Sequence, residues 1–76
     1  MIFKPIKYVI MSILKVIELL SDSEKSWEDA AARGVKKASE TIKNIRSAFV
    51  QNQSVTVKDG KVSHYRVNMK ITFEVE

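Results

Sequence analysis

The C-terminal stretch of the chain, from Val62 to Glu76, alternates between apolar and polar side chains. From Tyr65 to Val75 every odd position is apolar, and from His64 onward every even position is polar. Because successive side chains of a strand point to opposite faces, this pattern predicts a strand with one apolar and one polar face. At about 3.3 Å per residue it would span roughly 50 Å, far beyond the usual strand of about 5–6 residues. Such a strand is expected to curve around other elements or to pair beyond its own chain.

The chain has 76 residues, enough for one domain, and no cysteine. A domain this short buries only about 60% of the surface of its unfolded chain, and it has no disulfide or thiolate metal site to stabilise it. The hydrophobic content of 45% is ample for a small domain. Without disulfides or thiolate metal sites, oligomerisation is the remaining route to stability. The net charge of +4 comes from interspersed basic and acidic residues. Without a basic run or a basic–aromatic cluster, nucleic-acid binding is not expected.

Residues 1–12 are mostly apolar, with two lysines and one proline. Lys15 and Glu18 interrupt the apolar run that follows, and no small-residue cleavage site is present, so the segment does not resemble a signal peptide. It is also too short and too charged to span a bilayer. We therefore expect a cytoplasmic protein that binds no membrane, with residues 1–12 as an N-terminal extension and residues 13–76 as the domain.

The aliphatic-rich segment Ile13–Leu20 predicts a strand that ends at the polar residues 21–23. The range Ser26–Arg46 predicts the only helix, with Ser26 as its N-cap and Asp29 three residues later, as in a capping box. Apolar and small residues recur along this range at three- and four-residue spacing and so share one face. They are Trp27, Ala30, Ala31, Gly34, Ala38, Thr41, Ile42 and Ile45. Small residues in the middle of this face should let the helix approach the sheet closely.

The segment Ser47–Val57 is predicted to be the second strand. It is joined to the C-terminal strand through Asp59 and Gly60, and this residue pair tolerates the positive φ of tight turns. The predicted fold class is α+β with the order β-α-β-β, in which a three-stranded antiparallel sheet packs on one helix. One helix cannot cover so long a sheet, so copies of the same chain are expected to cover the remaining apolar surface.

Two registers are open for the predicted hairpin. A two-residue loop would place Val55 opposite His64. A three-residue loop with a bulge would place Val55 opposite Tyr65 and Phe49 opposite Ile71. The second register is favoured because it matches apolar residues with apolar residues.

Several stretches of the sequence resemble the dodecin family. They are K-V-I-E-L-L from Lys15, S-D-S-E-K-S-W-E-D-A from Ser21, N-I-R from Asn44 and D-G-K-V-S-H-Y-R-V-N-M-K-I-T-F from Asp59. The similarity extends from about Lys15 to Glu76. It implies a β-α-β-β protomer within a hollow, roughly spherical homododecamer. It also implies a flavin storage or scavenging protein, with riboflavin or FMN as the ligand, rather than an enzyme.

The sequence departs from the flavin-binding members of this family at two positions. Those members carry a Trp directly after the helix, in a pattern like L-D-W-F-E-V, and indoles of neighbouring subunits sandwich the flavin. Here I-R-S-A-F-V places Ser47 at that position, and Arg66 replaces a Gln that holds the polar edge of the flavin. Ser47 offers no stacking face, which weighs against flavin binding. Dodecin-like proteins without the Trp form a subgroup, and some are described as binding calcium.

The candidate ligand-binding residues are therefore Ser47, Gln51, Gln53 and Arg66. Arg66 could bind a carboxylate or phosphate through two hydrogen bonds, or it could close an empty pocket by pairing with a neighbouring subunit.

Other candidate residues have simpler structural roles. Trp27, the only Trp, is expected to pack on the helix face rather than to hold flavin. His64, the only His, has no clustered metal ligands beside it, so a solvated or interface position is favoured. Five carboxylates lie around the first strand–helix turn: Glu18, Asp22, Glu24, Glu28 and Asp29. They complement the helix dipole, and they would form a calcium site only with ligands from a neighbouring copy, so the metal-binding residues stay undefined.

The sequence contains no cysteine, a single histidine and only two glycines, and neither a nucleophile–base arrangement nor a phosphate-binding loop is present. An enzyme is therefore not expected. The sequence predicts a non-enzymatic, homo-oligomeric dodecin-like shell that binds or stores a small flavin-type ligand. The alternative is a structural or calcium-binding assembly of the same type without flavin.

Overall fold

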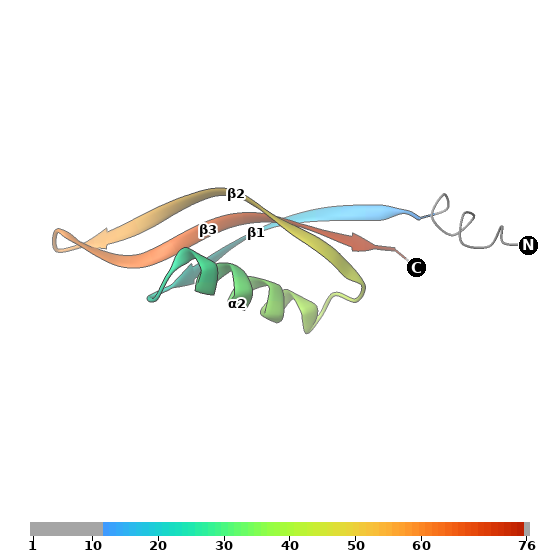
Figure 1. Ribbon diagram of the computed structural model, residues 1–76, viewed down its shortest axis with the longest axis horizontal. Helices are drawn as coiled ribbons and strands as arrows, with labels where there is room; N and C mark the ends of the chain where they lie inside the picture. The colour runs from blue at the N-terminus through green and yellow to red at the C-terminus, as the bar shows by residue number, and fades with distance from the viewer. Residues whose placement is uncertain (1–11, 76) are drawn as a thin grey trace, which may run out of the picture.

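A computed structural model describes residues 12–75 of the chain. Along this range the elements are β1 (Leu14–Ser23), α2 (Trp27–Ser39), β2 (Ile45–Lys58) and β3 (Lys61–Glu74). Figure 1 shows one elongated sheet with the helix beneath one of its faces. The predicted β-α-β-β order and α+β class are confirmed. Most of the predicted N-terminal extension, residues 1–11, lies outside the described range.

The long C-terminal strand is the centre of the sheet. The strands lie in the order β1-β3-β2, and both neighbours run antiparallel to β3. As the alternation predicts, the odd positions of β3 face the helix, and Val67, Met69 and Ile71 are fully buried there. The even positions lie on the opposite face, which no element of the described chain covers (Figure 1). We call this second surface the open face.

The start of α2 is fixed by a local capping interaction. Ser26 is the N-cap, and its Oγ accepts a hydrogen bond from the backbone N–H of Asp29 at 2.9 Å. The Asp29 carboxylate does not complete a reciprocal capping box, because it accepts hydrogen bonds from Ser23 and Arg33, both at 2.6 Å. The buried Ser23 and the half-buried Asp29 therefore tie the end of β1 to the first turn of the helix.

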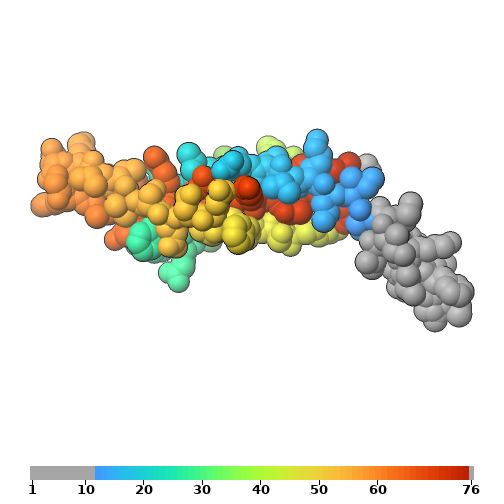
Figure 2. All heavy atoms as spheres, turned by 90° about the horizontal axis from the view of Figure 1, so that it is seen from above, coloured from blue at the N-terminus to red at the C-terminus, as the bar shows by residue number. Residues whose placement is uncertain are grey.

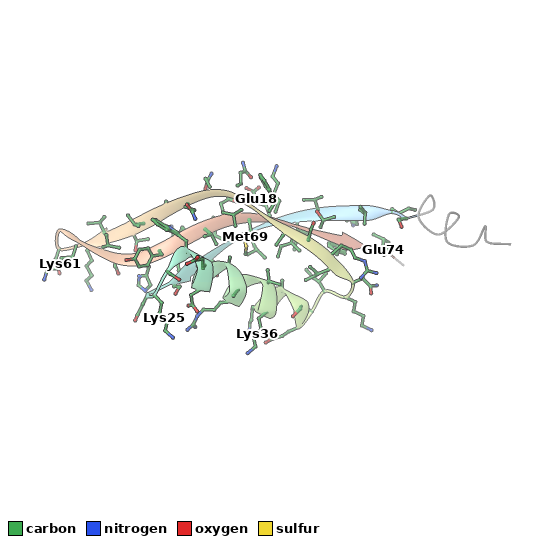
Figure 3. All side chains as sticks on the ribbon, in the orientation of Figure 1. Glu18, Lys25, Lys36, Lys61, Met69 and Glu74 are labelled. Atoms are coloured by element: carbon green, nitrogen blue, oxygen red, sulfur yellow. The ribbon has the colours of Figure 1, made fainter. Side chains whose placement is uncertain are left out.

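Small residues on α2 allow the close approach that the sequence predicts. Ala30, Gly34 and Ala38 are the buried positions of the helix. A Cβ atom added to Gly34 would lie only 2.5 Å from Cε of Met69 and 3.1 Å from Cβ of Ser21. Figure 3 shows Met69 between β3 and the helix. A larger residue at this position would therefore require the end of the Met69 side chain to shift.

The predicted helix is too long at its C-terminal end. It ends at Ser39 with Glu40 as the C-cap, Glu40 and Thr41 form a turn, and residues 42–44 have no regular secondary structure. Two β-branched residues, Thr41 and Ile42, follow the cap, and such residues favour helices less than straight-chain residues do. Asn44 adopts φ 63°, a left-handed conformation in which Asn is enriched. After Asn44 the chain enters β2 at Ile45, which pairs with Phe73 of β3. The strand therefore begins two residues before its predicted start at Ser47.

The predicted end of the first strand is also wrong. Polar residues 21–23 continue β1 instead of breaking it, and they pair with Val67, Arg66 and Tyr65 of β3. Sheet pairing and the interaction between Asp22 and Arg66 outweigh the low strand propensity of these polar residues.

The hairpin turn contains two residues, not three. Asp59 and Gly60 have φ of 53° and 76°, and Lys58 pairs with Lys61 across them. Two positive φ values define the type I′ turn that suits the twist of a hairpin. A register shift next to Val57 then restores the favoured alignment, so Val55 lies opposite Tyr65 as predicted.

The second half of the predicted register is wrong. Phe49 lies opposite Lys70 rather than Ile71, and Ala48 takes the position opposite Ile71. The cause is a β-bulge between Val50 and Asn52, which adds one residue to β2 and reverses the side-chain alternation beyond it. Phe49 therefore lies on the open face and is 65% exposed.

Candidate functional site

Within one chain, the four candidate ligand-binding residues do not form one pocket. Ser47 pairs with Thr72 and shares the open face with Arg66, but Thr72 and Arg66 are six positions apart along β3, which corresponds to about 20 Å. Gln53 pairs with Val67 and lies on the helix side of the sheet. Gln51 is the extra residue of the β2 bulge. A site that uses all four would need residues from more than one copy.

Arg66 is held by its own chain. Its Nε donates to Oδ1 of Asp22 at 2.7 Å, and its Nη2 donates to Oδ2 at 3.0 Å. The hydrogen bond from Arg66 lowers the pKa of Asp22, and the same bond raises the pKa of Arg66. This two-point contact is the bidentate binding expected for Arg66, but the carboxylate comes from the neighbouring strand of the same protomer.

The residues at these positions do not fit a flavin ring in the manner that the family resemblance implies. Ser47 presents a hydroxymethyl group where an indole would stack, and Arg66 presents a cation that is already paired. The structure adds one aromatic residue that the sequence interpretation missed. Phe49 lies two positions after Ser47 on the same face. The bulge that places it there has no clear signature in the sequence, although the polar run beside it, Gln51–Gln53, is the one available hint.

The carboxylates around the first strand–helix turn are dispersed. Asp22 binds Arg66, and Asp29 binds Ser23 and Arg33. The hydrogen bond from Ser23, followed by that from Arg33, lowers the pKa of Asp29. Among residues 12–75, no group of three or more His, Cys, Asp or Glu side chains could hold a metal ion. The carboxylates of one described chain therefore do not assemble into a calcium site.

Glu18 and Glu28 are exposed, and their carboxylates make no hydrogen bond or ion pair within the described residues. Glu18 points away from the helix side of the sheet (Figure 3). These two carboxylates are therefore available to groups outside the protomer.

Trp27 and His64 both contact other residues of their own chain. The Trp27 indole N–H donates to the backbone oxygen of Ser54 at 2.9 Å, and its ring meets Tyr65 edge-on at a centroid distance of 5.2 Å. His64 is half-buried, with Nδ1 at 2.8 Å from Ser63 Oγ and Nε2 at 3.7 Å from a carboxylate oxygen of Glu24. Trp27 packs against the core, as expected for a residue on the apolar helix face.

These features define a small α+β protein in which one helix covers one face of an antiparallel three-stranded sheet. The family model for Dodecin matches residues 13–76, and the chain belongs to the dodecin family. The resemblance seen in the sequence is thereby confirmed. In the described range, no helix is long and apolar enough to cross a membrane.

Comparison with individual proteins gives the same family. The calcium dodecin of Mycobacterium tuberculosis is 35% identical over 65 residues, which cover 86% of this chain and 92% of that protein. A crystal structure of that calcium dodecin, described as a calcium-chelating immunodominant antigen with a novel calcium-binding site, has a TM-score of 0.77 at 36% identity and covers 86% and 93% of the two chains. Dodecin from Streptomyces coelicolor has a TM-score of 0.83 at 26% identity, with 87% and 94% coverage.

Proposed function

We propose that this chain is the protomer of a non-enzymatic, self-assembling dodecin shell located in the cytoplasm, with the homododecamer as the expected assembly. The observation that carries this proposal is the amount of apolar surface that one protomer leaves in contact with water. Ten large hydrophobic side chains are exposed in the described chain, among them Leu20 at 62% and Phe49 at 65%. A monomeric protein rarely leaves so many large apolar side chains exposed, and such surface marks an interaction site.

The exposed surface follows from the dimensions of the elements. The 13 residues of α2 extend over about 20 Å, whereas the 14 residues of β3 extend over about 46 Å. No part of the described chain covers the open face (Figure 2), and at the hairpin end Val57 and Val62 remain 66% and 52% exposed. Further copies of the same chain can bury these residues without any other partner.

Sedimentation velocity at micromolar protomer concentration tests this proposal. We expect a species of about twelve protomer masses, and a stable monomer would contradict self-assembly. Phe49→Asp should dissociate the assembly, because it places a charge on the apolar part of the open face. Asn52→Asp is the matched control, since it introduces the same charge on the same face of β2 at a polar position, and it should leave the assembly intact.

For the ligand, we propose calcium rather than flavin. Ser47 and the paired Arg66 support the exclusion of flavin. The two exposed and unpaired carboxylates, Glu18 and Glu28, together with the relationship to a calcium dodecin, support a calcium site shared between protomers. Calcium takes six to eight oxygen ligands, which two or more copies can supply together.

Equilibrium dialysis against calcium and against riboflavin tests the choice of ligand. Retained calcium and a colourless protein are expected. Glu18→Gln and Glu28→Gln should each lower calcium retention if their carboxylates are ligands, whereas Glu74→Gln should not, because the Glu74 carboxylate already accepts two hydrogen bonds from Arg46. Visible flavin absorbance that stays with the dialysed protein would contradict the proposal.

A further inference from the structure

An apolar groove of about 580 Å³ runs between α2 and the edge strand β1. On the strand side it is lined by Ile17, Leu19 and Leu20, and on the helix side by Gly34 and Ala38. The glycine and alanine leave the groove open, because neither side chain extends beyond Cβ. Its volume falls within the range of about 300–1,000 Å³ that is common for small-molecule sites.

Among the described residues, the only charged ones that line the groove are two cations on α2, Arg33 and Lys37. They are four residues apart, so both project from the same side of the helix. Arg33 contacts Asp29 through Nε, and its other N–H groups remain available. Lys37 is 3.3 Å from Glu40, but its side chain is 84% exposed. Exposed contacts of this kind are weak and exchange easily with another anion.

From this geometry we infer that the groove binds a single-chain amphipathic anion, with its hydrocarbon chain along Ile17, Leu19 and Ala38 and its anionic head group at Arg33 and Lys37. The apolar walls account for the chain, because methylene groups that lie against them are removed from water. The two cations, Arg33 and Lys37, favour a negatively charged head group. The site is separate from Ser47 and Arg66, and it does not depend on the calcium site proposed above.

Binding of dodecanoate to the full-length assembly, measured by isothermal titration calorimetry, tests the inference. We expect saturable binding of dodecanoate and weaker binding of dodecanol, which has the same chain without the charge. The double variant Arg33→Gln, Lys37→Gln should weaken dodecanoate binding about tenfold and leave dodecanol binding unchanged. Lys36→Gln combined with Lys43→Gln is the matched control, because it removes the same charge from residues that do not line the groove.

A second variant tests the apolar part of the site. Ile17 lines the groove and is only partly buried, so Ile17→Ala should fold, and it should weaken binding of both ligands because it removes apolar surface from the groove wall. Three results would overturn the inference. The first is the absence of dodecanoate binding. The second is an equal loss of dodecanoate affinity in the Arg33→Gln, Lys37→Gln variant and in its control. The third is binding that occurs only after residues 1–11 are deleted or the assembly is dissociated. The last result would show that part of the protein itself occupies the groove.

Discussion

Replacing Gly34 by alanine should destabilise this protein, although the same change stabilises most helices. In the interior of a helix, alanine is favoured over glycine by about 1 kcal/mol. Here the added Cβ would lie 2.5 Å from Cε of Met69, and 3.1 Å and 3.3 Å from Cβ and Oγ of Ser21. Met69 is fully buried, so its terminal methyl group has little room to move, and overpacking of this kind costs about 1–3 kcal/mol. The expected net loss is therefore about 1 kcal/mol.

A double-mutant cycle separates the two effects. Met69→Leu removes Cε, the atom of closest approach, and should cost less than about 1.5 kcal/mol by itself. In the Gly34→Ala background it should cost less or stabilise, with a coupling energy of about 1 kcal/mol. The control is Ala32→Gly, at an exposed position of the same helix, which reports helix propensity without contact to the sheet.

Urea denaturation at one fixed protomer concentration is the appropriate assay, because assembly makes the apparent stability depend on concentration. If Gly34→Ala stabilised the protein by the amount that Ala32→Gly costs, the close contact with Met69 would have no energetic effect. Strictly additive effects of Gly34→Ala and Met69→Leu would refute the same argument.

Three other changes have expected outcomes. Ser26→Ala should lower the free energy of unfolding by about 1 kcal/mol, because the N–H of Asp29 loses its cap; an unchanged urea midpoint would contradict this. Asp22 has a folded-state pKa below its ordinary value of 3.8 because of Arg66, so its stabilising effect is complete above that value and is lost as the pH falls below it; Asp22→Asn should make unfolding less sensitive to acid over this window. Deletion of residues 1–12 should leave the assembly intact, since the family similarity begins after them, and a truncated chain that sediments as a monomer would show that they belong to the shell.

The elements of this fold could be predicted because their sequence patterns are local. The alternation along β3, the cap at Ser26 and the Asp59-Gly60 turn each depend on neighbouring residues alone, and the structure contains all three. The errors occur where a distant contact decides the outcome. Residues 21–23 stay in β1 because β3 pairs with them.

The candidate site was less predictable for the same reason. The pairing of Arg66 with Asp22 joins residues that are 44 positions apart in the sequence, and no periodic pattern connects them. The position of Phe49 depends on a bulge between Val50 and Asn52, and a bulge can be accommodated by many sequences. Any site completed by a second copy depends on contacts that lie beyond a single chain.

The pair between Asp22 and Arg66 changes how a flavin site could be restored in this protein. Ser47→Trp adds the stacking surface, which is worth about 0.5–1.5 kcal/mol per aromatic pair beyond area burial. This change alone should have little effect, because the Arg66 that a neighbouring copy would have to bring to the ring would remain a cation tied to its own Asp22. The combination of Ser47→Trp with Arg66→Gln supplies an amide in place of the cation. It also leaves Asp22 without its partner, so Asp22→Asn should be added to avoid an unpaired carboxylate.

Titration of riboflavin, followed by its fluorescence, reports binding in these variants, because an indole stacked on the flavin ring quenches its emission. The wild-type protein should quench weakly or not at all, and the triple variant should quench in a saturable manner. Phe49→Ala in the triple-variant background tests whether the exposed phenyl ring of the same face contributes to binding. Saturable quenching by the wild type would contradict the proposal that Ser47 and Arg66 exclude flavin. If the triple variant did not quench, the surface around Ser47 would differ from a flavin site in more than these side chains.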